Sequence, residues 1–279
     1  MDTIRTSSLF HYTDYNTLKS ILVDGLIPNY CLEDLSVEDI DFVLGIPMIC
    51  FCDIPLTRTK DFCGQYGNFA IGLNKDWCFR NRVNPVFYAS DSNIIISVRF
   101  YRNYEQSLRG IVKQAGGNIH SLNINLSDSN SVQNIVPFIN LNNAYSANRA
   151  LFGYLKRYES EWKGKPYVNY DENEWRYVVS ESAQVSWFWK RDDYMNWRGD
   201  TNRRKPTPTE SLQSQRLTFD VTDISHIIVQ DEEQVARMID FIDSNRLNQI
   251  GGNVTTPSEK DKKILISRII SQERIATDF

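Results

Sequence analysis

The stretch Tyr170-Asp171-Glu172-Asn173-Glu174-Trp175-Arg176-Tyr177-Val178-Val179 is the most informative segment of the chain. Side chains alternate between the two faces of a strand. If this segment is a strand, one face carries Glu172, Glu174, Arg176 and Val178. The opposite face carries Trp175, Tyr177 and Val179. Two carboxylates about 7 Å apart along one face suit a division of catalytic labour: one stabilises an oxocarbenium-like sugar and the other orients or deprotonates an acceptor. The alternative is a solvated strand end in which Glu174 and Arg176 form an ordinary ion pair.

The N-terminal region predicts a strand, a helix and a turn in close succession. Residues 9–12 read as a strand, and Thr13 or Asp14 is placed to cap a helix whose apolar residues recur at helical spacing. Gly25 is expected to end that helix. His11 and Thr13 lie two apart, so both face the same way on the strand, where each can hydrogen-bond ribose hydroxyls. A structural histidine at a strand end is the plainer alternative.

A second apolar strand is predicted at Pro47-Met48-Ile49-Cys50-Phe51-Cys52, and a third at 69–73. Cys50, Cys52 and Cys63 invite a zinc interpretation, but structural zinc sites use paired CxxC knuckles or nearby histidines, so we expect no metal. Buried core thiols explain these cysteines better. Tyr66 precedes the third strand beside a glycine, where its ring can stack on a flat ligand. A core tyrosine is the alternative.

Several other segments carry weaker predictions. The acidic stretch 31–45 reads as a loop or short helix on the surface, and 93–100 fits a strand or a helix equally. Residues 147–158 look helical. The late strand 224–230 precedes a helix that is expected to begin after Asp231. From Ser258 onward the tail reads as a basic amphipathic helix.

The stretch 190–205 combines basic and aromatic residues before two prolines and is predicted to be a mobile loop. Aromatic platforms with interleaved cations suit single-stranded nucleic acid. The candidate contacts there are Arg191, Trp197, Arg198, Arg203, Arg204 and Lys205. The plainer alternative is a solvated charged loop, with Trp187 and Trp189 in the core.

Composition limits the class of protein. The chain has 279 residues, 41% hydrophobic residues and a net charge of −4, so it is globular and not a nucleic-acid binder by overall charge. We expect no leader peptide and no membrane span, and five cysteines in such a chain favour a reduced, cytoplasmic protein. Strands and helices mix without regular alternation, which favours an α+β fold. We predict one α+β domain over 1–250, followed by a linker and an amphipathic helix over 251–279.

Together these segments resemble the AbiGi family of bacterial abortive-infection proteins. The resemblance rests on FHYT with LKSIL-DGLIP, on Tyr30-Cys31-Leu32-Glu33-Asp34, on IPMICFCDIPL, on YGNFAIGLNKDW with NPVFYA, and on ENEWRYV. It covers residues 9–180, with a looser match over 224–242. The family is known as the antitoxin half of a two-gene phage-defence system, which implies a cognate toxin or antitoxin as a partner and no mechanism.

A more distant resemblance, to DarT-like mono-ADP-ribosyltransferases, implies a mechanism and a split, mixed central sheet with flanking helices and a C-terminal helix. By that likeness, His11 and Thr13 hold the adenosine-side ribose of NAD, and Tyr66 or Tyr12 stacks on nicotinamide. Glu174 binds the nicotinamide ribose and stabilises the cation, while Glu172 addresses the acceptor. The chain lacks the family's Ser-Thr-Ser segment, since CFCD stands at the expected middle strand, and it has no clear second tyrosine.

Three functions follow from these observations. The leading hypothesis is a phage-defence toxin that transfers ADP-ribose from NAD to nucleic acid, RNA before DNA. The second is a non-catalytic antitoxin or sensor that binds a partner protein. The third, a metal-dependent nuclease, fits less well because the carboxylates do not group as a two-metal cluster.

Overall fold

The protein is described by a computed structural model that covers residues 6–38, 40–58, 66–114, 140, 143–162, 164–199, 208–244 and 247–278. Its centre is an eight-stranded sheet in the order β12 (Ile269–Ser271), β11 (Ile224–Val229), β4 (Phe69–Asn74), β1 (Ser8–Thr13), β3 (Val43–Cys52), β10 (Glu174–Val178) and β5 (Asn84–Pro85), with β2 (Asn29–Asp34) paired to β3. Two small sheets lie beside it: β6 (Phe87–Ala89) with β7 (Leu155–Arg157), and β8 (Glu159–Trp162) with β9 (Lys165–Val168). Parallel and antiparallel pairs both occur, so the fold is mixed α+β, as predicted.

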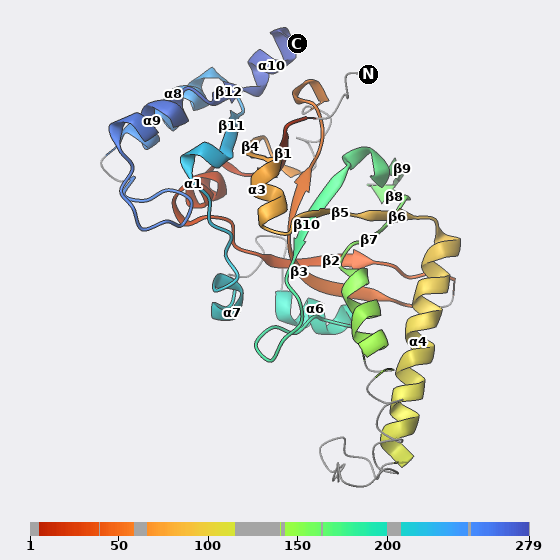
Figure 1. Ribbon diagram of the computed structural model, residues 1–279. Coiled ribbons are helices and arrows are strands. Elements are labelled where there is room, and N and C mark those ends of the chain that lie inside the picture. Colours follow the sequence, from red (N-terminus) through yellow and green to blue (C-terminus); the bar gives the residue numbers. More distant parts are fainter. Residues whose placement is uncertain are drawn as a thin grey trace.

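Helices pack around this sheet, with α8 and α9 near one edge and α4 at the other (Figure 1). The longer ones are α1 (Tyr15–Asp24), α4 (Asp91–Gln114), α6 (Arg191–Arg198), α8 (Glu232–Asp243) and α9 (Glu259–Ile266). The shorter ones are α3 (Lys75–Arg80), α7 (Glu210–Gln213) and α10 (Gln272–Asp278), and residues 143–152 are also helical. The first half of helix α4 packs against the body of the molecule through Ile94, Val98 and Tyr101, and its C-terminal end extends away from it (Figure 1).

Strand β3 connects three neighbours and organises the sheet. Its first part pairs with β2, where Asp34 is opposite Val43, and its last part pairs with β10, where Glu174 is opposite Cys52. Cys52 also pairs with Phe10 of β1. The segment that we expected to be the middle strand therefore lies between the histidine strand and the acidic strand.

The β1–α1 unit follows the sequence prediction closely. Asp14 caps the helix by accepting hydrogen bonds from the backbone N–H groups of Asn16 and Thr17, at 2.9 and 3.0 Å. Gly25 ends it with φ of +80° and donates to Ile21 O. A Cβ at Gly25 would lie 2.6 Å from Leu217 O, so only glycine satisfies both the backbone angle and the close approach.

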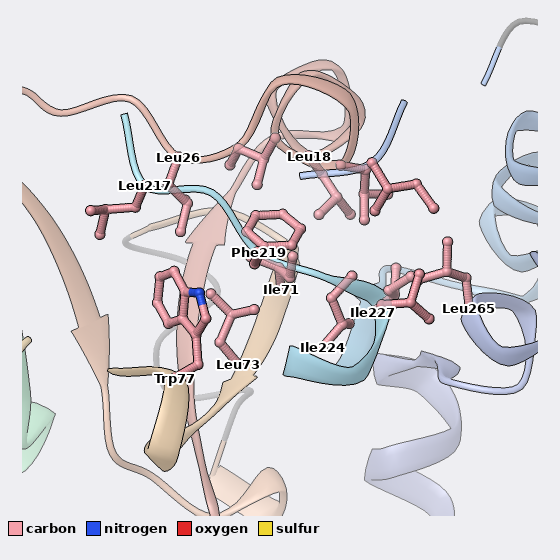
Figure 2. Close-up of a cluster of buried hydrophobic side chains, with 14 of the residues drawn as sticks. Leu18, Leu26, Ile71, Leu73, Trp77, Leu217, Phe219, Ile224, Ile227 and Leu265 are labelled. Carbon is pink, nitrogen blue, oxygen red and sulfur yellow. The ribbon is translucent and has the colours of Figure 1, made fainter. Parts of the chain in front are cut away.

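The largest hydrophobic cluster packs against the β1, β4 and β11 part of the sheet (Figure 2). Its side chains come from α1, α3, α8 and the sheet, and the fully buried ones include Leu18, Ile71, Trp77 and Ile227. Trp77 is the bulkiest and donates its indole N–H to Thr218 O at 2.9 Å. Because the indole N–H is hydrogen-bonded, burial of the ring stabilises the fold without leaving an unsatisfied donor in the core.

The structure corrects three sequence predictions and decides one that was left open between strand and helix. The acidic stretch 31–45 is largely strand, because β2 and the start of β3 form a hairpin in which Glu33 is opposite Leu44. The ambiguous segment 93–100 belongs to helix α4. The first half of the predicted 190–205 loop is helix α6. The C-terminal tail is not one helix, because β12 lies between α9 and α10 and pairs with β11 in parallel.

Candidate functional site

A pocket of about 910 Å³ opens beside β1, β3 and β10. The residues predicted for a shared site all line it: His11, Tyr12, Thr13, Tyr66, Glu172 and Glu174. They come from segments far apart in the sequence, which the adjacency of β1, β3 and β10 brings together. A cavity of this size is in the range that holds a small-molecule ligand.

Glu174 is the first residue of β10 and its side chain is 5% exposed. Its carboxylate accepts from Arg176 Nε at 2.7 Å and from Lys156 Nζ at 2.6 Å. Burial alone would raise the pKa of this carboxyl, but the two cations outweigh burial and hold the pKa of Glu174 well below its ordinary value. The side chain is therefore a carboxylate at any physiological pH. The alternative weighed above, a Glu174–Arg176 ion pair, is present, but it is buried at a pocket floor and not solvated.

Glu172 reaches the same place by a different route. It ends a 3₁₀ turn, η3 (Asn169–Glu172), and Asn173 then takes a left-handed conformation with φ of +43°. Glu172 is therefore not on the strand, contrary to the alternation argument. Its carboxylate accepts from Tyr66 Oη at 2.8 Å and from Lys156 Nζ at 2.6 Å, so Lys156 bridges Glu172 and Glu174.

Arg176 extends the network to a third acid. Its side chain is fully buried and donates to Glu33 at 2.8 Å and to Gly153 O at 3.0 Å, besides Glu174. Burial raises the pKa of Glu33 even though the Arg176 cation opposes that shift. A chain of alternating charges thus runs from Glu33 through Arg176, Glu174 and Lys156 to Glu172, and all of these residues except the fully buried Arg176 line the pocket.

His11 lies on the β1 side of the pocket. Its Nδ1 is 2.7 Å from Cys50 O, and because a carbonyl only accepts, Nδ1 carries the proton of this hydrogen bond. In the neutral ring the other nitrogen, Nε2, is then an acceptor. Thr13 and Tyr12 are both buried, and Tyr12 packs with Phe10 and other residues in a small hydrophobic cluster, while Tyr66 is 39% exposed.

Three members of this site were missed from the sequence. Lys156 lies on β7, in a segment predicted to be helical, and Glu33 was assigned to a surface loop. Tyr167 on β9 lines the pocket and hydrogen-bonds Glu172. The pKa of this tyrosine is raised, mainly by burial. Lys156 and Tyr167 have no motif around them, and Glu33 lies in the Tyr30-Cys31-Leu32-Glu33-Asp34 segment that carries the family resemblance, which gives it no role. The only available signal was the pair of acids itself, since two buried carboxylates require cations or donors beside them.

The predicted nucleic-acid contacts are only partly within the described residues. Arg191 pairs with Asp34 at 2.6 Å. Trp197 is half-buried and packs on Tyr30 and Phe188. Arg198 is half-buried in the last turn of α6, while the other candidates, Arg203, Arg204 and Lys205, lie outside the described residues.

Other chemistry at this site is limited. Cys52 is buried and burial raises the pKa of its thiol, and Cys50 hydrogen-bonds Cys31. In the part of the chain that the structure describes, no three His, Cys, Asp or Glu side chains are grouped to hold a metal ion. Across the same residues, no helix has the length and apolar character needed to cross a bilayer.

With this geometry in place, comparison with known proteins identifies the family. The model of a putative abortive phage resistance protein, AbiGi, antitoxin, matches residues 24–230. The chain belongs to the AbiGi family. The match extends from the end of α1 through β11 and includes Glu33, Lys156, Glu172, Glu174 and Arg176, that is, the whole charged network.

A curated AbiGi relative supports the same assignment. The abortive phage resistance protein AbiGi of Lactococcus lactis subsp. cremoris is 30% identical over 249 residues, which cover 84% of this chain and 89% of the relative. The family resemblance inferred from the sequence is therefore confirmed. No solved structure matches this chain, so the ADP-ribosyltransferase-type architecture stays a prediction.

Proposed function

We propose that this chain is the antitoxin of an abortive-infection system and that it neutralises a cognate toxin by binding it. The observation that supports the proposal is the family match, whose description names an antitoxin and which spans 24–230. A non-catalytic role also suits Glu174, because a carboxylate held by two cations is already neutralised within the protein.

The surface that we propose for the toxin is the exposed side of α4. Ile96 and Phe100 are 64% and 54% exposed, and one helical turn separates them, so both lie on the same side of the helix. Phe100 contacts Tyr104 edge-on one turn later. A row of large exposed apolar side chains is typical of a protein-binding surface. Ile94, Val98 and Tyr101 anchor this part of the helix in the core, so Ile96 and Phe100 lie on its exposed side, where a partner has access to them.

Co-expression tests this role. The candidate toxin is the product of the gene that adjoins this one, and we expect it to arrest growth when expressed without this chain. Wild-type chain should restore growth, and the double variant Ile96→Glu/Phe100→Glu should not. Val254→Glu, at a residue that is 91% exposed elsewhere, is the matched control and should restore growth. If this chain is itself toxic and Glu174→Gln removes the toxicity, the antitoxin role is wrong.

A second function, NAD-dependent mono-ADP-ribosyl transfer to nucleic acid, is favoured by one specific observation. His11, Thr13, Tyr66 and Glu174 line a single pocket that is large enough for a dinucleotide. The strand that carries Cys50 and Cys52 lies between the strands of His11 and Glu174, which is the place that the transferase likeness requires.

In this second function each side chain has a definite task. The bond between the ribose C1′ and nicotinamide breaks, nicotinamide leaves with the bonding electrons, and an acceptor oxygen or nitrogen forms the new bond to C1′. The ionised Glu174 accepts from the ribose 2′-hydroxyl and stabilises the oxocarbenium ion, and Glu172 takes the proton of the acceptor. Nε2 of His11 accepts a hydrogen bond from a ribose hydroxyl. Lys156 Nζ must share or release the Glu174 oxygen that the 2′-hydroxyl requires.

Labelled NAD tests the second function directly. The protein is incubated with NAD that carries its label in the adenosine part, and RNA, DNA and protein are then separated. Transfer is expected to RNA before DNA, and Glu174→Gln should abolish it. Glu181→Gln, which removes an acid that pairs with Arg149 outside the pocket lining, is the control and should retain transfer. Intact NAD with every acceptor would rule out the transferase.

A further inference from the structure

Strand β2 is an edge strand whose outer backbone groups point away from the sheet. Among the described strands it pairs with β3 alone. On the opposite edge of β3, Gly45 N donates to Phe188 O at 2.8 Å and Gly45 O accepts from Phe188 N at 2.9 Å. Leu32 of β2 lies opposite Gly45, so this pair exchanges no hydrogen bonds. The backbone N–H and C=O of Leu32 therefore point to the outer edge of β2.

This outer edge is open at Leu32. Among the described residues, no hydrogen bond engages the N–H or the C=O of Leu32 there. The positions on either side are already occupied, because Tyr30 N–H donates to Asn29 Oδ1 at 2.8 Å and Asp34 O accepts from Arg157 Nε at 3.2 Å. An open strand edge is a ready site for pairing with another chain.

The open edge faces the pocket described above. Leu32 lines that pocket, as do Asn29 and Asp34 at the two ends of β2. Helix α1 lines it as well, from Thr17 to Asp24. The pocket is therefore a groove along a six-residue strand, which is about 20 Å long. An extended segment that adds to a free edge gains main-chain hydrogen bonds from the strand and specificity from its side chains.

The charges of the groove favour a basic segment. Its basic side chains Lys156 and Arg157 are already engaged, Lys156 with two buried acids and Arg157 with Asp91. Asp24, by contrast, accepts from the neutral Gln249 side chain at 3.2 Å and has no ion pair among the described residues. A lysine or arginine brought by a partner would supply the missing cation.

The groove is continuous with the surface proposed for the toxin on α4. The β2–β3 turn touches that helix, because Glu38 pairs with Arg99 at 3.0 Å and Asp41 O accepts from Arg102 at 3.2 Å. One partner that covers Ile96 and Phe100 can therefore extend a segment to β2.

We propose that the outer edge of β2 pairs with an extended segment of the toxin that carries lysine or arginine, and that the backbone of Leu32 is the centre of this contact. The inference rests on the antitoxin function proposed above and gives the toxin a second point of attachment. In the complex the segment adds a strand to β2, and its basic side chain lies near Asp24.

Two substitutions at one residue test the pairing. Leu32→Pro removes the outward N–H, and proline is tolerated on an edge strand when its nitrogen faces outward. Leu32→Ala, the matched control, loses the same side-chain packing but keeps the N–H. Binding of the purified full-length chain to the product of the adjoining gene is measured by biolayer interferometry. Leu32→Pro should weaken binding at least about tenfold, and Leu32→Ala should stay within about threefold of wild type.

If Leu32→Pro does not fold, synthetic peptides decide the question on the wild-type chain. Overlapping peptides that cover the toxin are titrated by fluorescence polarisation, and we expect a lysine- or arginine-bearing peptide to bind. N-methylation of alternate amides in that peptide should abolish binding in one phase and leave it within about threefold in the other, because only every second amide of an added strand faces β2. Binding by no peptide, or equal sensitivity of both phases, would overturn the inference.

The outcomes separate this contact from the antitoxin role. Equal binding by folded Leu32→Pro and Leu32→Ala, with loss in Ile96→Glu/Phe100→Glu, overturns the strand pairing and leaves the antitoxin role standing. Failure of the wild-type chain to bind the toxin overturns both.

Discussion

The two faces of β10 carry opposite kinds of side chain, and the charged face is the more deeply buried of the two. On one face, Trp175 and Tyr177 pack against the hydrophobic cluster that Trp77 and Ile71 belong to. On the other face, Glu174 and Arg176 are no more exposed, yet they are charged and joined to Lys156. One strand therefore separates an apolar core from an ionic one.

The two faces of β10 contribute differently to the stability of the fold. Apolar burial contributes stability of about 25 cal/mol for each Å² removed from water. Buried ion pairs often contribute little net stability, because desolvation offsets their attraction. An apolar residue at these positions would stabilise the fold at least as well. The apolar face therefore contributes most of the stability of this region, and the charged face contributes little net stability.

The largest expected effect is on the charged face. Arg176→Met leaves two buried carboxylates without this partner and should lower the free energy of unfolding by about 3–5 kcal/mol. Urea unfolding followed by circular dichroism measures it. Arg237→Met, which breaks an exposed pair with Glu233, is the control and should change the free energy by less than about 1 kcal/mol.

A double variant shows whether unbalanced charge is the cause. Adding Glu174→Gln to Arg176→Met removes one of the stranded carboxylates, so the double variant should be more stable than Arg176→Met alone. Equal or lower stability would assign the loss to packing, and the contrast between the two faces would fail.

The apolar face gives the next effect. Ile71→Ala removes a fully buried side chain from the cluster and should cost about 2–5 kcal/mol, measured by the same urea unfolding. Unlike the loss at Arg176, this loss should be independent of pH between 5 and 8, because no titrating group is stranded. A pH-dependent loss would show that the two faces are not separate.

Acid titration gives a smaller effect. Because the pKa of Glu174 is lower in the folded protein than the unfolded value of about 4.3, its contribution is present above that value and is lost as pH falls. Glu174→Gln should therefore flatten the loss of stability in acid. The raised pKa of Glu33 has the opposite sign, with stability present below the unfolded pKa and lost as pH rises, so Glu33→Gln should not flatten it. Unfolding midpoints measured from pH 3 to 7 distinguish the two.

The smallest effect concerns the thiols. Burial raises the pKa of Cys78, in the apolar core, to about 12. The contribution of this group to stability is present below the unfolded pKa of about 8.5 and is lost as pH rises from there. At pH 8.5 iodoacetamide should label half-buried Cys31 before Cys78, as read by peptide mass spectrometry. Equal labelling would show that the core opens readily.

The apolar face and its local caps were predictable from the sequence. Helical spacing predicted α1, and the capping role of Asp14 follows from its short polar side chain. The alternation of Trp175 with Arg176 placed those side chains on opposite faces of one strand. Such features depend on neighbours within a few residues, which is the range that a sequence pattern reports.

The charged network was only half predictable. Glu174 and Arg176 are two apart, so the sequence shows their pairing. Lys156 joins Glu174 across 18 residues and Glu33 joins Arg176 across 143 residues, and no pattern in the sequence spans such distances. The acids of β2 looked solvent-exposed because a run of charges usually is. The left-handed Asn173 that turns Glu172 into the pocket carries no signal either.

The ion pair between Glu33 and Arg176 links the β2–β3 hairpin to β10. The two parts of the pocket lining that these elements supply are therefore connected directly. We therefore expect a ligand that binds in the pocket to restrain the motion of the hairpin as well as that of the acids. Slower deuterium uptake by the amides of β2 would then report occupancy at a distance, even where the ligand touches none of them.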